Sequence, residues 1–370
     1  MGGRMIRNVL HFLRRTALRL TSRARSIYYR SMGVNIEGNG RLHGISIPRN
    51  WADITLEYGV TLDAGVTILC GGPPFLQPLA CGHTLDETGA PGANYDKAEF
   101  RLWYPDNAGF LRAVLALVPG SNADGRPDVG DRSWQAFAIR NGLALIGCHF
   151  TDKPHDETFI EKYANAAQGS GQALLDALTA FSKRSDHPEL ANAPLLLWGM
   201  SAGGEFNYEF TAWKPDRVVA FVVNKGGIYF SALLPAAARC VPGFLFVGAE
   251  DLESRKLTVA GLFALNRKAG ALWAFAEEPN VGHVVGRSQE MAAIFFDAVL
   301  PMRLGTPASA GTSAPLTTLD LRSGILGDVV QKSFRPASNR PNPTSLTAWF
   351  PTDRVARSWQ ALLRSEPFDR

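Results

Sequence analysis

The chain has 370 residues with 46% hydrophobic content, which is enough for one full hydrophobic core and a smaller module beside it. Its net charge of +4 is uneven, because residues 1–30 carry eight arginines and no acidic residue, which leaves −4 for the remainder. The excess positive charge is confined to residues 1–30, so we expect no nucleic-acid partner. The four cysteines form no Cys-x-x-Cys pair, so we expect no zinc site, no disulfide framework and a reducing compartment such as the cytoplasm.

Residues 1–30 have an amphipathic pattern. Ile6, Leu10, Leu13, Ala17 and Leu20 share one helical face, and arginines surround it. This pattern is typical of a helix that lies on anionic lipid, and a basic helix packed on its own protein accounts for it equally well. Arginines interrupt every apolar run, so we expect no secretory signal and no membrane span. We expect a cytoplasmic protein that either contacts a membrane peripherally through 1–30 or is simply soluble.

Residues 31–75 contain an internal repeat of six residues. Residues 59–64 read Gly-Val-Thr-Leu-Asp-Ala and residues 65–70 read Gly-Val-Thr-Ile-Leu-Cys, with Ile54 six positions before Val60. The stretch resembles the opening coils of hexapeptide-repeat sugar O-acyltransferases, in which each hexad forms one side of a left-handed β-helix. The resemblance implies two or three coils, which suits a docking or oligomerisation module rather than a second active site. An ordinary β-meander with a chance repeat is the alternative. We interpret residues 76–94 as a linker.

Residues 95–304 alternate between strand and helix patterns. Residues 99–104 alternate polar and apolar, as an edge strand does. Continuous apolar runs predict buried strands at 114–118, 143–147, 195–198, 218–223, 244–247 and 271–275. Helical patterns fall between them at 134–140, 171–182, 257–268 and 289–299. This alternation predicts an α/β fold with a doubly wound, mostly parallel sheet.

The most informative motif in this region is Gly199-Met200-Ser201-Ala202-Gly203, which fits G-x-S-x-G between an apolar run and a helical segment. In that setting a strand turns sharply into a helix and exposes the serine hydroxyl, and small residues are needed because backbone passes close by. Asp251 follows the strand at 244–247, and His283 follows the strand at 271–275.

This order of serine, aspartate and histidine resembles the α/β-hydrolase superfamily over about residues 95–304. The short separations resemble its compact members: dienelactone hydrolases, polyhydroxybutyrate-depolymerase-like esterases, and feruloyl or acetyl esterases. The resemblance implies that Ser201 is the nucleophile, Asp251 the orienting acid and His283 the general base. Glu250 is the rival acid, although the Gly-x-x-Asp spacing favours Asp251.

The resemblance also implies an oxyanion hole. The backbone N–H of Ala202 is one expected donor, and the loop after 114–118 supplies the other, from Ser121 or Asn122. Only about twenty residues separate Val223 from Phe244, which leaves no room for a large lid. We therefore expect an open crevice, with Tyr229 and Phe230 as candidate substrate-binding residues.

The C-terminal part begins with a Pro/Ala/Ser/Thr-rich linker at 305–317. The extension at 318–370 contains one helical pattern, at 352–363, and we expect it to pack on the hydrolase domain. The whole pattern favours a serine esterase that acts on a small ester or a polymer end through an acyl-enzyme, with no metal and no cofactor. The alternatives are an acyltransferase to a sugar or alcohol, and an inactive binding protein. The sequence predicts no particular oligomeric state.

Overall fold

The computed structural model describes residues 35–36, 41–42, 55–56, 61–62, 81–157, 159–305, 315–336 and 344–368. The chain forms two compact units, Met1–Pro78 and Leu79–Arg370. The amphipathic pattern expected at 1–30 lies outside the described residues, as do most of the predicted hexads.

Two short parallel pairs are described in the first unit. β1 (Asn35–Ile36) pairs with β3 (Thr55–Leu56), and β2 (Arg41–Leu42) pairs with β4 (Thr61–Leu62). Both pairs join residues twenty positions apart, whereas a coil of three hexads would span roughly 18 residues. The hexapeptide-repeat module therefore stays a prediction.

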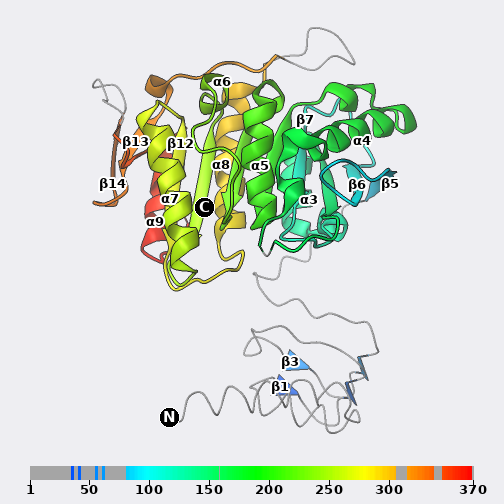
Figure 1. The fold of residues 1–370 in the computed structure, drawn as a ribbon, viewed down its shortest axis with the longest axis horizontal. Coiled ribbons are helices and arrows are strands. Elements are labelled where there is room, and N and C mark those ends of the chain that lie inside the picture. The colour runs from blue at the N-terminus through cyan, green and yellow to red at the C-terminus, as the bar shows by residue number, and fades with distance from the viewer. Residues whose placement is uncertain are drawn as a thin grey trace. The chain divides into compact units, whose positions relative to one another are not determined.

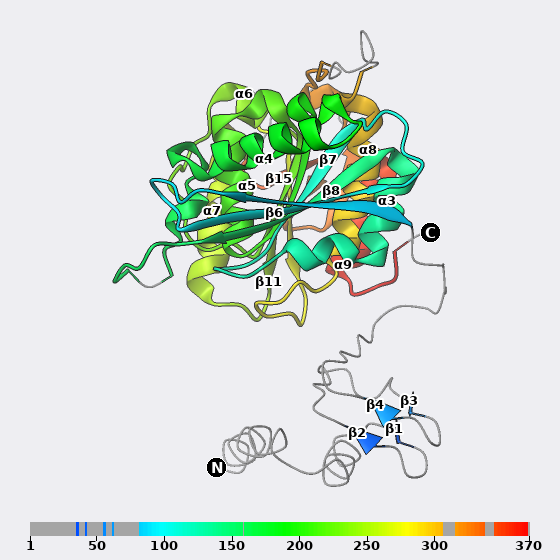
Figure 2. The ribbon, with the colours of Figure 1, turned by 90° about the vertical axis from the view of Figure 1, so that its right-hand side faces the viewer.

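The second unit is built on an eight-stranded sheet (Figures 1 and 2). Its strand order is β12-β11-β10-β9-β7-β8-β6-β5, and every pair is parallel except β5–β6 and β6–β8. The predicted α/β fold with a doubly wound, mostly parallel sheet is therefore confirmed. The strands are β5 (Gly82–Gly89), β6 (Lys97–Pro105), β7 (Ala113–Val118), β8 (Leu143–Thr151), β9 (Leu195–Met200), β10 (Val218–Asn224), β11 (Gly243–Gly248) and β12 (Trp273–Glu278).

Helices cover both faces of this sheet (Figure 2). Helices α4, α5 and α7 lie on one face, where the Asn266 side chain of α7 donates to the Tyr208 hydroxyl of α5. Helices α3, α8 and α9 lie on the other, where Arg140 of α3 pairs with Asp297 of α8. The helices are α3 (Arg132–Asn141), α4 (Ser170–Arg184), α5 (Ala202–Trp213), α6 (Ala236–Arg239), α7 (Glu253–Lys268), α8 (Ser288–Arg303) and α9 (Asp353–Leu363). Short 3-10 turns occur at Arg126–Gly130, Lys162–Ala164, Ala166–Gln168, Pro188–Asn192, Pro215–Arg217 and Leu321–Ser323.

The central strands could be predicted from the sequence because they are buried on both faces. Every residue of β7, β10 and β11 is buried, as the continuous apolar runs predict for strands covered on both faces. The expected linker at 76–94 needs correction, because Gly82–Gly89 forms the edge strand β5. β5 is partly exposed along its length and has one large apolar side chain, Leu85, so its sequence carries no buried-strand signal.

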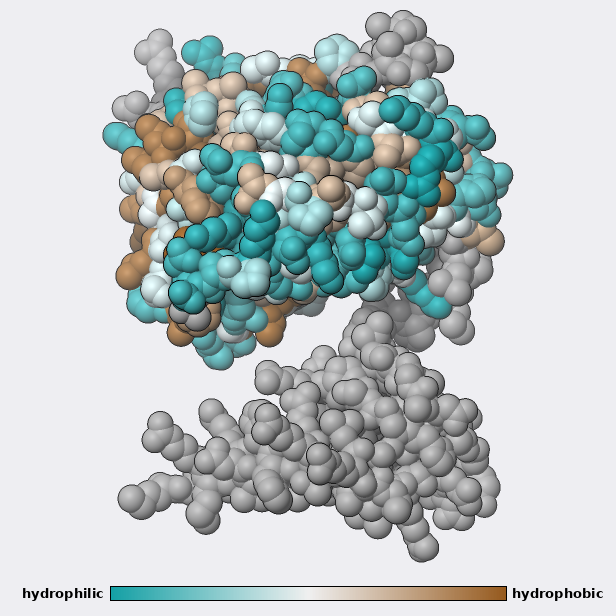
Figure 3. All heavy atoms as spheres, turned by 45° about the vertical axis from the view of Figure 1, so that its right-hand side comes forward, coloured by the Kyte–Doolittle hydropathy of each residue, from teal (hydrophilic) through white to brown (hydrophobic). Residues whose placement is uncertain are grey.

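The C-terminal extension packs on the main sheet. β13 (Ile325–Asp328) lies between β14 (Ser333–Pro336) and β15 (Thr347–Phe350) in an antiparallel sheet that the sequence does not predict. Helix α9 follows, and its Trp359 Nε1 donates to the Phe275 carbonyl of β12 at 2.8 Å. Val355, Trp359 and Leu362 are buried in the same core as the sheet. Figure 3 shows that hydrophilic side chains predominate on one face of this unit, with hydrophobic ones gathered toward one side.

Candidate active site

Ser201 lies at a sharp turn between β9 and α5. Its backbone has φ 54° and ψ −124°, a conformation that is costly for a residue with a side chain and is therefore held by its surroundings. The Ser201 N–H donates to the Asn224 carbonyl at the end of β10 at 2.8 Å. This bond fixes the turn against the neighbouring strand, so the serine hydroxyl projects beyond the end of the sheet.

The two glycines of the motif are needed for close backbone approach. A Cβ atom on Gly203 would collide with the Val118 carbonyl at the end of β7. A Cβ atom on Gly199 would collide with the Gly203 carbonyl. The helix α5 therefore begins in contact with β7 and β9 only because both positions lack a side chain, as expected from the motif.

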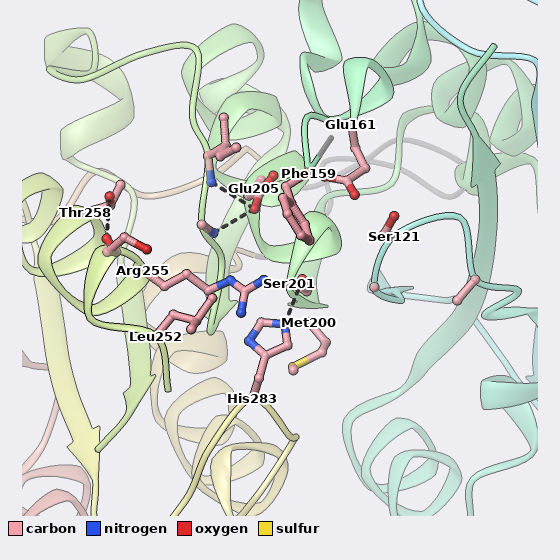
Figure 4. A pocket seen from close by; sticks show the side chains of 15 residues that line it. Ser121, Phe159, Glu161, Met200, Ser201, Glu205, Leu252, Arg255, Thr258 and His283 are labelled. Carbon is pink, nitrogen blue, oxygen red and sulfur yellow. Dashed lines mark hydrogen bonds between the residues drawn. The ribbon is translucent and has the colours of Figure 1, made fainter. Parts of the chain in front are cut away.

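His283 and Asp251 reach Ser201 from two other strand ends. His283 Nε2 lies 3.0 Å from Ser201 Oγ, and His283 Nδ1 lies 2.8 Å from Asp251 Oδ2 (Figure 4 shows the first contact). The Asp251 side chain is only 2% exposed. Glu250, the rival acid, is exposed, and no hydrogen bond joins it to His283. The structure thus brings together the serine, histidine and aspartate that the sequence selects.

The environment of Asp251 favours its ionised form. Burial raises the pKa of the carboxyl group, but hydrogen bonds from His283, the Leu252 N–H and Arg255 outweigh it, so the pKa is lowered overall. Leu252 N lies 2.7 Å and Arg255 Nη1 3.2 Å from Oδ1, which leaves Oδ2 to His283. An ionised carboxylate here accepts the Nδ1 proton, so Nε2 is left able to accept a proton from Ser201.

A buried ion pair lies behind the histidine loop. Lys225 Nζ is 3.0 Å from Glu278 Oε2, and their side chains are 0% and 3% exposed. The same Nζ contacts the Val285 carbonyl, while Glu278 Oε1 accepts the Arg287 N–H at 2.6 Å. Burial lowers the pKa of Lys225, and the Glu278 charge opposes that shift. The pair therefore ties β10 and β12 to the segment just after His283. Sequence reasoning did not identify it.

Ala202 and Ser121 lie where the two predicted oxyanion-hole donors are expected, next to Ser201. The Ala202 N–H is the first of α5 and so has no partner within the helix. The loop after β7 passes beside Ser201, because a Cβ on Gly120 would lie 3.6 Å from the Ser201 Cβ. Ser121 lines the pocket next to it.

Asn122 is engaged elsewhere, which makes it the wrong choice for the second donor. Its N–H donates to the Tyr163 hydroxyl at 3.2 Å, and its Oδ1 accepts the Asp152 N–H at 2.8 Å. The side-chain amide donates to Ser121 Oγ at 3.1 Å. These bonds hold the loop, and they leave Ser121 as the candidate donor.

A pocket of about 780 Å³ opens over Ser201 and His283. Its walls come from the end of β9, the starts of α5 and α7, and the loops that follow β7, β8, β10, β11 and β12. It thus lies at the carboxyl ends of the strands, where α/β sheets bind ligands. Besides Ser201 and His283, the lining residues are Gly120, Ser121, Ala123, Phe159, Glu161, Met200, Glu205, Gly227, Ile228, Leu252, Ser254, Arg255 and Thr258. Phe159, Glu161 and Arg255 lie on loops or at a helix start without a sequence motif, so sequence reasoning missed them.

The expectation that Tyr229 and Phe230 bind substrate is not supported, because neither lines this pocket. The Tyr229 ring packs edge-on against Tyr208, 5.0 Å between ring centres, and its hydroxyl is buried. Phe230 is exposed, and its N–H donates to Glu209. Phe159, Leu252 and Met200 supply apolar side chains to the pocket in their place.

Glu205 is a buried carboxyl group in the pocket wall. Burial raises its pKa to about 7, although hydrogen bonds from the Ile228 and Gly227 N–H groups, at 3.0 and 2.7 Å, oppose the shift. These bonds hold the loop after β10 against the start of α5 (Figure 4). Glu205 is therefore partly neutral at neutral pH.

No metal-binding group was predicted. In the part of the chain that the structure describes, no group of three or more His, Cys, Asp or Glu side chains is placed to hold a metal ion. No described helix has the length and apolar character needed to cross a bilayer.

No protein-family model and no curated protein matches the chain. Among solved structures, it is similar to a ferulic acid esterase at 14% identity, over 60% of this chain and 96% of the other, with a TM-score of 0.41. It is similar to the fluorophosphonate-binding serine hydrolase F of Staphylococcus aureus at 11% identity, over 60% and 98% of the two chains, with a TM-score of 0.41. A Pyrobaculum calidifontis esterase is similar at 15% identity, over 60% and 85%, with a TM-score of 0.42.

Proposed function

We propose that this chain is a serine hydrolase that cleaves carboxylic esters through an acyl-enzyme intermediate. The observation that carries the proposal is the pair of hydrogen bonds from Ser201 to His283 and from His283 to Asp251, which begins at a strained turn above the sheet. Nucleophile, base and orienting acid in hydrogen-bond contact are what activation of a serine hydroxyl requires.

In the proposed reaction, Ser201 Oγ attacks the ester carbonyl carbon while His283 Nε2 takes the hydroxyl proton. The carbonyl oxygen becomes an oxyanion, which accepts hydrogen bonds from the N–H groups of Ala202 and Ser121. The carbon–oxygen bond to the alcohol then breaks, and His283 returns the proton to the leaving alkoxide. Water attacks the acyl-enzyme with the same base, and this step releases the acid and restores Ser201.

The test is covalent labelling combined with turnover. Purified protein should react with a fluorophosphonate probe and hydrolyse p-nitrophenyl butyrate. Ser201→Ala should lose both properties while it keeps its circular dichroism spectrum, and for scale the nucleophile of a studied protease contributes about 10⁶-fold to kcat. Ser333→Ala, which removes an exposed hydroxyl in β14, is the matched control and should keep both. Labelling and turnover that persist in Ser201→Ala would refute the proposal.

A further inference from the structure

Arg255 projects into the pocket beside the reactive residues. It lies in the first turn of α7, and its guanidinium points toward Ser201 and His283 (Figure 4). Its Nη1 contacts Asp251 Oδ1 at 3.2 Å, and 23% of its side chain is exposed. A guanidinium has five N–H donors, and among the described residues Asp251 is the acceptor found for those of Arg255. The other donors are therefore available to a bound molecule.

Neighbouring residues restrain the position of this guanidinium. The Arg255 stem passes Gly227, where an added Cβ would lie 3.3 Å from both Cγ and Nε of the arginine. The Gly227 N–H is in turn held by the buried Glu205. Asp251 restrains the end of the side chain, and Gly227 leaves room for its middle. An arginine restrained at both points loses less freedom when it binds a ligand than a free surface arginine does.

The charged groups of the pocket are arranged asymmetrically. Arg255 and its partner Asp251 lie on one wall, and Glu205, which is partly neutral at neutral pH, lies near Arg255. Glu161 lies across the cavity from Arg255 (Figure 4), and it is partly exposed. Phe159 lies between them in Figure 4, and Leu252 and Met200 also contribute apolar surface to the pocket. A molecule with one anionic end is attracted to Arg255 and repelled from Glu161, so the two charges together specify one orientation for it. The apolar side chains strengthen both effects because they reduce the local dielectric.

We propose that Arg255 selects esters that carry a carboxylate within reach of the scissile ester bond. This inference rests on the proposed ester hydrolysis and adds the substrate class to it. A planar guanidinium and a carboxylate form paired, charge-assisted hydrogen bonds, which are stronger and more directional than neutral ones. Arg255 acts here as a specificity-determining residue, while Ser201 and His283 carry out the reaction.

Two matched pairs of esters test the proposal. The first pair places the charge on the acyl side: 4-nitrophenyl hydrogen glutarate against 4-nitrophenyl pentanoate. The second places it on the alcohol side: 4-acetoxybenzoate against methyl 4-acetoxybenzoate. In at least one pair the wild-type protein should favour the anionic ester. Arg255→Gln should then lower kcat/KM for the anionic ester on the order of 10- to 100-fold more than for its neutral partner.

The ratio of kcat/KM for the anionic ester to kcat/KM for its neutral partner is independent of any general damage to the active site. Loss of the Arg255–Asp251 contact lowers turnover of both esters by a common factor, which cancels. Arg255→Lys should keep part of the preference, because the charge remains without the paired geometry. Lys256→Gln removes a neighbouring charge that does not line the pocket, and it should leave the ratio unchanged.

Two results would overturn the inference. If Arg255→Gln lowers the anionic and neutral esters equally in both pairs, Arg255 serves only to support Asp251, and ester hydrolysis stands without this selection. If the wild-type protein cleaves none of the four esters and takes no fluorophosphonate, the proposed hydrolysis is wrong, and the substrate class falls with it.

Discussion

The buried Lys225–Glu278 pair gives a prediction about stability that can be separated from catalysis. Lys225→Met removes the cation and leaves the Glu278 carboxylate, in a 3% exposed side chain, with the Arg287 N–H as its remaining partner. Breaking a buried pair in this way costs about 3–5 kcal/mol, because an uncompensated charge stays inside the protein. That is a large share of the roughly 5–15 kcal/mol by which a domain is stable. Lysine and methionine both have an unbranched side chain, so the positive φ of 58° at position 225 affects the wild type and the variant alike.

The double variant Lys225→Met/Glu278→Gln should recover most of this loss, since it contains no unpaired buried charge and the amide oxygen still accepts the Arg287 N–H. Activity should not recover with it. The Val285 carbonyl loses its contact with Lys225 Nζ, which helps to hold the segment after His283, and a shift of about 1 Å in such a site can cost 10²-fold in rate.

Urea unfolding at pH 7 measures the stability, and p-nitrophenyl butyrate turnover measures the activity. The control is Arg101→Met, which breaks the more exposed pair between Arg101 and Asp86 and should cost at most about 1 kcal/mol. The reasoning is refuted if Lys225→Met is no less stable than Arg101→Met, or if the double variant is as unstable as the single one.

Two further predictions concern carboxyl groups near the site. Asp251→Asn should reduce kcat by about 10⁴-fold, which is the loss caused by the corresponding change in the Ser-His-Asp triad of a serine protease. Glu250→Gln should change kcat little. The reverse ranking in steady-state assays would assign the orienting role to Glu250. Glu205 has a raised pKa, so the folded state binds its proton more tightly than the unfolded chain. The contribution of Glu205 to stability is therefore complete below pH 4.5 and is lost as the pH rises through about 7. Glu205→Gln should therefore gain about 2.5 kcal/mol relative to wild type between pH 5 and pH 8 in urea unfolding, and a constant difference would contradict the assigned burial effect.

The parts of the fold that could be predicted are those in which burial dictates composition. β7, β9, β10 and β11 are covered by helices on both faces, so their sequences are continuous apolar runs with visible ends. β5 and the three-stranded sheet of β13, β14 and β15 were missed. β5 is an edge strand with polar, partly exposed residues, and β13–β15 are four-residue strands, too short to show a period.

The residues of the candidate site also differ in how far the sequence predicts them. Ser201, Asp251 and His283 each follow a strand of a parallel sheet, and the carboxyl ends of such strands meet at one edge, so chain order alone indicates that they converge. Most of the other residues that line the pocket come from loops and from the starts of helices. Arg255 could have been noticed because it lies four residues after Asp251, a spacing at which the two side chains meet across the start of α7. Phe159 had no such signal, because it lies in the loop after β8, where no helical or strand spacing relates it to the reactive residues.

The reactive residues and the other pocket residues carry different information about the activity. The hydrogen-bonded serine, histidine and aspartate support a reaction type, because any ester placed over them presents the same carbonyl group to Ser201. They carry no information on the remainder of the substrate. We infer that this information lies in the charged side chains around the pocket, where Arg255 at the start of α7 and Glu161 on the loop after β8 occupy opposite walls. A neutral ester therefore tests the triad and an anionic ester tests Arg255, and the two experiments can fail independently.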